Sequence, residues 1–392
     1  KSINFYHNLS ILIFAPMIYF HIPFCKQACH YCDFHFSTSL KYKENMLAAM
    51  QQEIVKRAHY LADKQVYSLY FGGGTPSILD SEDILQLIGT VEKHFEIAPD
   101  AEITLEANPD DLTADKVRAL RHTPINRFSI GIQSFFEEDL RWMNRAHNAG
   151  EADSSIKRVQ DAGFENITCD LIYGYPLLTD EKWKSNMQKL IAMDIPHISS
   201  YSMTVEKRTA LAHFVKEGKT PAMSDAQSAE QMMMLIETLT DNGFEHYEIS
   251  NFAKQGMYAK HNTNYWKGTH YLGIGPSAHS FNGTSRSWNV ANNAKYIAAL
   301  ADNSEFQEIE NLTQEDQFNE YVMTALRTMW GLDLQKVEQE FGYDYKQHIL
   351  RESQRFIDVH GLEYTPEGKL RTTIKGKLMA DHIASELFAL AD

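Results

Sequence analysis

Cysteine is scarce in this chain: four occur among 392 residues, and three of them, Cys25, Cys29 and Cys32, fall within eight positions. So few thiols exclude a disulfide framework and suit a reducing compartment. The fourth, Cys169, lies among apolar residues and is expected in the core. No C-x2-C or H-x3-H pair follows downstream to complete a four-ligand structural zinc site. The three clustered thiols are therefore the main candidates for a metal centre.

Positive charge and long apolar runs are also lacking. There are 37 Lys and Arg against 52 Asp and Glu, and the net charge of −15 makes nucleic acid an unexpected partner. The apolar segment 11–20 contains Pro16 and is too short to cross a bilayer, and it lacks the features of a signal peptide. A cytoplasmic protein is expected. Because residue 1 is not methionine and a strand pattern begins at Met17, residues 1–16 are expected to be an upstream extension or an artefact.

Six short runs of β-branched and aromatic residues alternate with longer amphipathic stretches. This alternation predicts strands joined by right-handed helical crossovers, and so an α/β fold whose parallel sheet forms a partial (β/α)6 barrel. The predicted strands are 17–22, 66–71, 102–105, 127–132, 167–172 and 197–203, and the helices between and after them are 41–63, 81–94, 113–121, 151–163, 180–193 and 224–243.

Unusual polar residues follow the predicted strands rather than the helices. In a parallel barrel all strand C-termini open on one face, where active sites are built. We therefore expect these residues to meet there. In strand order they are the three cysteines, the segment 72–76, Glu106, Gln133, Asp170 (inside its strand) and Thr204.

The sequence pattern changes after about residue 251. Glycine-rich and aromatic-rich sequence runs from 261 to 288, and acidic helical sequence begins near 303. We predict a barrel over 17–250, a connecting region over 251–302 and a smaller, mostly helical C-terminal domain over 303–392.

The cysteine loop has the spacing C-x3-C-x2-C. Thiolates at such spacing suit an iron–sulfur cluster, and three ligands leave one iron open for another molecule. Zinc or unligated cysteines are the alternatives. The loop resembles that of the radical S-adenosylmethionine (SAM) enzymes, which bind SAM at the open iron.

Several polar groups match what SAM requires. The glycines of 72–74 allow close backbone approach, and Glu106 has oxygens that accept from an ammonium. Arg145 suits bidentate pairing with a carboxylate, while Gln133 and Asp170 offer acceptors for ribose hydroxyls. Taken singly, each is equally well explained as a tight turn, a surface polar group or an ion pair.

Seven segments together resemble the coproporphyrinogen-oxidase-like branch of radical-SAM proteins. They are Tyr19, 25–32, 72–76, 105–110, 127–135, 145–147 and 170–176. The resemblance implies that Cys25, Cys29 and Cys32 ligate a [4Fe-4S] cluster. It implies that the SAM site is lined by Tyr19, Tyr31, Gly73, Gly74, Thr75, Glu106, Gln133, Arg145, Asp170 and Thr204.

This branch contains both oxygen-independent coproporphyrinogen III dehydrogenases and heme chaperones. The dehydrogenases have a further cysteine two residues beyond the third ligand, where this chain has Phe34, and a long N-terminal arm, where only 24 residues precede Cys25. The segment 261–266 matches the H-N-x-x-Y-W motif of the heme chaperones. The motif implies contacts from His261, Tyr265 and Trp266 to heme b, while a cap at a turn and a filled domain junction are the alternative. Other possible iron ligands are His21, His30, His35, His270 and His279.

The resemblance leaves three functions open. The first is a heme chaperone, monomeric or dimeric and possibly peripheral at the membrane, that delivers heme to hemoproteins such as those of membranes. The second is the oxidative decarboxylation of two propionates of coproporphyrinogen III through a 5′-deoxyadenosyl radical. The third is radical chemistry on another substrate. The missing cysteine and the short arm favour the first.

Overall fold

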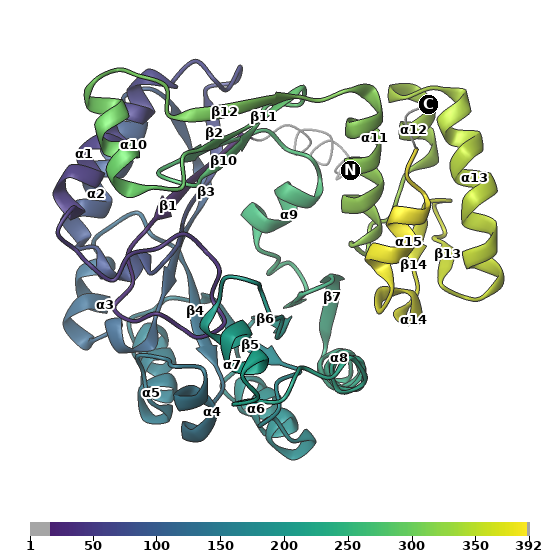
Figure 1. Ribbon diagram of the computed structural model, residues 1–392, viewed down its shortest axis with the longest axis horizontal. Helices are drawn as coiled ribbons and strands as arrows, with labels where there is room; N and C mark the ends of the chain where they lie inside the picture. The colour runs from purple at the N-terminus through teal and green to yellow at the C-terminus, as the bar shows by residue number, and fades with distance from the viewer. Residues whose placement is uncertain (1–15, 390–392) are drawn as a thin grey trace, which may run out of the picture.

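The computed structural model describes residues 16–389, so the predicted extension lies almost wholly outside the described part. The fold is built on one curved twelve-stranded sheet, ordered β12-β11-β10-β9-β1-β2-β3-β4-β5-β6-β8-β7 (Figure 1). The first six strands pair in parallel, which confirms the predicted α/β barrel; they are β1 (Met17–Ile22), β2 (Gln65–Gly73), β3 (Glu96–Ala107), β4 (Arg127–Gln133), β5 (Asn166–Tyr173) and β6 (His197–Ser202).

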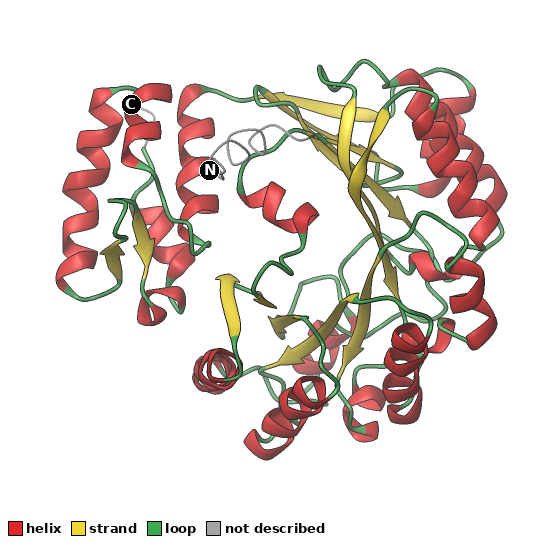
Figure 2. Ribbon diagram, turned by 180° about the vertical axis from the view of Figure 1, so that it is seen from behind, coloured by secondary structure: helices red, strands yellow, loops and turns green. Residues whose placement is uncertain are grey.

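Helices cover the outer face of these strands, as the predicted crossovers require (Figure 2). Several begin at a Thr, Asn or Ser whose side chain accepts from an amide of the first turn, among them Thr113, Asn148, Thr179 and Ser224. These helices are α1 (Lys43–Lys56), α2 (Ser81–Glu92), α3 (Ala114–Leu120), α4 (Glu137–Trp142), α5 (Ala149–Asp161), α6 (Asp180–Ala192) and α8 (Asp225–Asp241). The short helix α7 (Ala210–Lys216) instead packs on the cysteine loop, where Leu211 N donates to His30 O (2.8 Å).

Most of the predicted connecting region extends the sheet. Strand β9 pairs in parallel with β1, with Tyr271 opposite Met17, and so adds a seventh parallel strand that the sequence pattern did not reveal. The further strands are antiparallel at their pairings, and α9 lies on the inner side of the sheet (Figure 1). These elements are β7 (Phe244–Glu248), β8 (Asn251–Lys254), α9 (Lys260–Trp266), β9 (Tyr271–Ile274), β10 (His279–Phe281), β11 (Ser285–Asn289), α10 (Asn293–Ala301) and β12 (Gln307–Asn311).

The C-terminal part packs around a small hydrophobic core of its own, which includes Phe318, Leu332 and Ile383. It is joined to the sheet by backbone hydrogen bonds from Ile249 N to Arg327 O (3.1 Å) and from Met329 N to Tyr247 O (2.9 Å). Its elements are α11 (Gln314–Leu326), α12 (Leu334–Glu340), α13 (Tyr343–Asp358), β13 (Leu362–Tyr364), β14 (Leu370–Thr372), α14 (Ile374–Lys377) and α15 (Ala380–Glu386). Within residues 16–389, none of the helices combines the length and apolar character that a membrane crossing requires.

A buried carboxylate ties α1 to the later strands. Glu53 is fully buried and accepts from Arg57 Nη1 (3.1 Å), Asn289 Nδ2 (2.8 Å), Gly275 N (2.8 Å) and Tyr296 Oη (2.5 Å). Removing one member of such a network leaves the others buried without partners. Arg57 Nη1 also donates to Gly273 O in β9 (3.2 Å), so the Glu53–Arg57 pair holds the seventh parallel strand and the residues after it to the first crossover helix.

Replacing Glu53 by Ala is expected to lower the free energy of unfolding by about 3–5 kcal/mol, because a buried guanidinium loses its counter-charge. Chemical denaturation followed by circular dichroism measures this. The matched control is Glu44→Ala, since Glu44 lies on the same helix with its side chain 81% exposed; its change should stay within about 0.5 kcal/mol. Equal effects of the two substitutions would contradict the role given to Glu53.

Candidate functional site

A cavity of about 720 Å³ opens at the C-terminal ends of the parallel strands. All of the residues expected to bind the cluster or SAM line it except Tyr19; they are Cys25, Cys29, Tyr31, Cys32, Gly73, Gly74, Thr75, Glu106, Gln133, Arg145, Asp170 and Thr204. One detail of the expectation was wrong: Gly73, Glu106 and Gln133 do not follow their strands but belong to the last residues of β2, β3 and β4. Strand pairing therefore fixes their positions more firmly than a loop would.

The glycine segment after β2 holds the start of the cysteine loop. Gly74 N donates to Ile22 O (2.9 Å), and Thr75 N donates to Phe24 O (2.6 Å). A side chain on Gly74 would place its Cβ 2.6 Å from Phe24 O, so glycine is required by this close approach. The Thr75 side chain also lies beside the Cys25 thiol, where it partly offsets the rise in the thiol pKa that burial causes. The two segments are thus locked together at the edge of the cavity.

The three thiols are partly buried beside one another and face the cavity. Burial, followed by smaller effects of its neighbours including Cys29 and Cys25, raises the pKa of Cys32 to about 12, and burial raises the pKa of Cys25. Within residues 16–389, no three His, Cys, Asp or Glu side chains converge on the position of a single metal ion. The expectation of a cluster therefore rests on the chemistry of the three cysteines. Their thiols are soft ligands, and the raised pKa values of Cys25 and Cys32 mean that these two need a strongly positive partner to lose their protons.

Arg145 is the cation nearest to the thiols. Its Nη1 lies 3.4 Å from Cys29 Sγ and 3.3 Å from Tyr31 Oη, and its Nη2 donates to Asn108 Oδ1 and Gly131 O, both at 2.8 Å. Its Nε is buried without a partner in the described part of the chain. The guanidinium is thus fixed in place while one donor stays available.

Two carboxyl groups line the same cavity from β3 and β5, the strands on either side of β4. Burial raises the pKa of Glu106 to about 7 and that of Asp170 to about 6. Tyr70 Oη donates to Glu106 Oε1 (2.7 Å), and Ser129 Oγ lies 3.3 Å from both oxygens of Asp170. Such carboxyls keep part of their protonated form near neutral pH, and a nearby cation or hydrogen-bond donor favours the ionised form. Both are therefore suited to a positively charged, hydroxyl-bearing ligand.

Gln133 ends β4 in a left-handed conformation, with φ of 65°. Its buried Oε1 has no hydrogen-bond partner among the described residues. A positive φ in a non-glycine residue and an unpaired buried acceptor are both costly, and such features concentrate where ligands bind.

His261 holds α9 to the sheet. Its side chain is buried, and its Nδ1 and Nε2 hydrogen-bond to Ser68 Oγ (2.8 Å) and Tyr265 Oη (3.1 Å). Its backbone N donates to Glu102 Oε1 (3.0 Å), and burial lowers the pKa of the imidazole to about 3. As placed here, His261 would bind iron only after losing one of its two ring hydrogen bonds.

Two other residues of this motif, Asn262 and Trp266, lie four positions apart on α9. Asn262 lines the large cavity, while the Trp266 ring lies 5.3 Å from the Arg327 guanidinium. The sequence reasoning did not single out Asn262, Tyr70, Arg327 or Asp381, which line the cavity or support its carboxyl groups. Arg327 and Asp381 come from the C-terminal part, and no sequence signal placed them at the barrel mouth.

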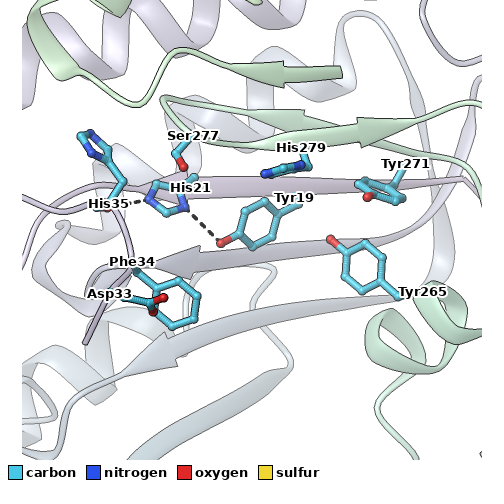
Figure 3. A pocket seen from close by; sticks show the side chains of 9 residues that line it. All are labelled: Tyr19, His21, Asp33, Phe34, His35, Tyr265, Tyr271, Ser277 and His279. Atoms are coloured by element: carbon cyan, nitrogen blue, oxygen red, sulfur yellow. Dashed lines mark hydrogen bonds between the residues drawn. The ribbon is translucent and has the colours of Figure 1, made fainter. Parts of the chain in front are cut away.

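A second cavity, of about 380 Å³, is shown in Figure 3. Tyr19 and Tyr265 line it instead of the larger one, and Asp33 and Phe34 line both. The full lining is Tyr19, His21, Asp33, Phe34, His35, Tyr265, Tyr271, Ser277 and His279.

Comparison with known proteins adds to this geometry. Residues 19–190 match the radical SAM superfamily, and residues 312–376 match the HemN C-terminal domain. The chain is 30% identical to the heme chaperone HemW of Bacillus subtilis, over 93% of this chain and 97% of that protein. The chain belongs to the HemW family of radical-SAM proteins.

Other relatives agree with this assignment. The heme chaperone HemW of Mycobacterium tuberculosis H37Rv is 32% identical, with 95% of this chain and 96% of that protein covered. The solved structure of coproporphyrinogen III oxidase (HemN) from Escherichia coli superposes with a TM-score of 0.82 at 24% identity, over 96% of this chain and 91% of that one. HemN therefore shares the fold, and the superfamily implies a [4Fe-4S] cluster and SAM.

The raised pKa of Glu106 gives a test by pH. In the SAM-free protein, folding favours protonated Glu106, because its pKa of about 7 exceeds the ordinary 4.5 of the unfolded chain. This contribution is fully present below about pH 4.5 and is lost as the pH rises through about 7. Relative to Glu106→Gln, the wild-type protein should lose at most about 3 kcal/mol of stability across this window. Denaturant unfolding at several pH values measures the difference, and parallel curves for the two proteins would contradict the assignment.

Proposed function

We propose that this protein is a heme chaperone that binds heme on a radical-SAM scaffold and passes it to hemoproteins, including those of membranes. The observation that carries the proposal is the similarity to several proteins named heme chaperone HemW along nearly their whole length. Phe34, at the position of the dehydrogenases' further cysteine, supports the same choice.

In this proposal the three thiols hold the cluster. A [4Fe-4S] cluster on three thiolates supplies an open iron for SAM and, when reduced, one electron for its sulfonium. Cys25, Cys29 and Cys32 fit because they line one cavity on a loop that Gly74 and Thr75 fix in place. Arg145 offers a positive charge beside this loop, where anionic sulfur gathers.

The remaining walls of the large cavity fit SAM. Glu106 would ionise to accept from the ammonium, and Arg145 would offer its free Nε to the carboxylate. Gln133 Oε1 and the Asp170 carboxyl would accept from ribose hydroxyls, which would satisfy the unpaired acceptor. Thr204, which follows β6, lines the same cavity and would bound the SAM site on the β6 side.

Loss of one cysteine tests the cluster. Replacing Cys29 by Ser is expected to reduce bound iron and sulfide after anaerobic reconstitution to near zero, because a serine hydroxyl rarely replaces a thiolate ligand. Cys169→Ala is the matched control, since Cys169 lies fully buried in β5, outside the large cavity's lining, and its loss should leave iron and sulfide unchanged. Stoichiometric iron and sulfide in Cys29→Ser would contradict the assignment.

Two assays of the reconstituted protein test the function: one with heme and one with coproporphyrinogen III. Titration with heme should give a saturable Soret band, and the loaded protein should transfer heme to an apo-hemoprotein. Incubation with SAM, a reductant and coproporphyrinogen III should yield no decarboxylated porphyrin by mass spectrometry.

The alternative is an oxygen-independent coproporphyrinogen III oxidase, and the shared HemN fold is the observation that favours it. Decarboxylated product from protein with a verified cluster would establish that alternative and remove the chaperone proposal. Absence of both heme binding and decarboxylation would favour radical chemistry on another substrate.

A further inference from the structure

The second cavity contains an imidazole whose ring nitrogens make no hydrogen bond within the described chain. Three histidines line it: His21, His35 and His279. The Nε2 of His21 donates to His35 O (2.8 Å) while its Nδ1 lies 3.3 Å from Tyr19 Oη, and His35 Nε2 donates to Asn293 Oδ1 (2.7 Å). Among residues 16–389, neither ring nitrogen of His279 has a hydrogen-bond partner.

The position of His279 is firmly set. It begins the short strand β10 and pairs with Trp288 of β11, whose ring centroid lies 6.2 Å from the imidazole. Figure 3 shows the imidazole between His21 and Tyr271, above the Tyr19 ring. A side chain on a paired strand presents its lone pair with little freedom, as a metal ligand should.

Aromatic rings surround this imidazole. Tyr19, Tyr265 and Tyr271 form the floor and one end of the cavity, and Phe34 stands at the rim with 66% of its surface exposed (Figure 3). Aromatic side chains provide large flat apolar contacts for a planar ligand. A volume of about 380 Å³ is at the lower end for ligand pockets, so a flat ligand would be only partly enclosed and would extend over Phe34.

We propose that heme binds in the second cavity with the His279 imidazole as the axial ligand to its iron. The neutral imidazole donates a lone pair to the iron, and no covalent bond breaks. This assignment rests on the proposed heme-chaperone function. It differs from coordination by His261, whose Nδ1 already bonds to Ser68 of β2 and whose Nε2 already bonds to Tyr265 of α9.

The experiment is a spectrophotometric titration of the cluster-loaded protein with heme, supported by resonance Raman of the iron–ligand modes. His279→Ala is expected to weaken binding at least tenfold and to shift the Soret band, and added imidazole should restore the wild-type band. His122→Ala, another exposed histidine outside both cavities, is the matched control and should bind as the wild type does. Cluster iron should be equal in all three proteins.

A second variant tests the cavity without changing the proposed iron ligand, His279. Phe34→Ala removes an exposed ring and is expected to speed heme release several-fold without moving the Soret band. Wild-type affinity and spectrum in His279→Ala would overturn the site while leaving the chaperone function in place. Absence of heme binding by the wild-type protein would instead overturn the proposed function, and this site with it.

Discussion

The barrel mouth depends on the close approach of two backbones, at Gly74 and at Phe24. The amides of Gly74 and Thr75 donate to carbonyls at the end of β1 and the start of the cysteine loop. These two hydrogen bonds attach the start of the cysteine loop to the sheet, so β1 and β2 hold the thiols in position. Any side chain at position 74 would push the loop off the sheet.

The barrel mouth also contains buried polar groups without hydrogen-bond partners within residues 16–389. The Glu106 and Asp170 carboxyls are buried, Gln133 Oε1 lacks a donor, and Arg145 Nε lacks an acceptor among the described residues. Folding therefore accepts desolvated polar groups that a suitable ligand would satisfy. The ligand-free protein is less stable because these buried polar groups lack partners. A molecule that carries both charges and hydroxyl groups removes this cost when it binds, and its affinity is higher for that reason.

The parallel barrel and the cysteine loop were predictable because both follow from local pattern: strand periodicity and a thiol spacing. Cavity residues such as Glu106 and Gln133 were found because strand C-termini converge in any parallel barrel. Three features depend on non-local packing and were missed: β9 joining as a seventh parallel strand, Arg327 reaching the mouth from the C-terminal part, and the placing of Tyr19 in a separate cavity. The motif 261–266 shows a further limit, since its histidine carries structural bonds that no sequence pattern displays.

Asp33 and Phe34 line both cavities. They directly follow Cys32, so their backbone is continuous with the loop that bears the thiols. A molecule bound in one cavity that displaced these two residues would therefore alter the lining of the other. By thermodynamic linkage, the effect on binding free energy would be equal in both directions.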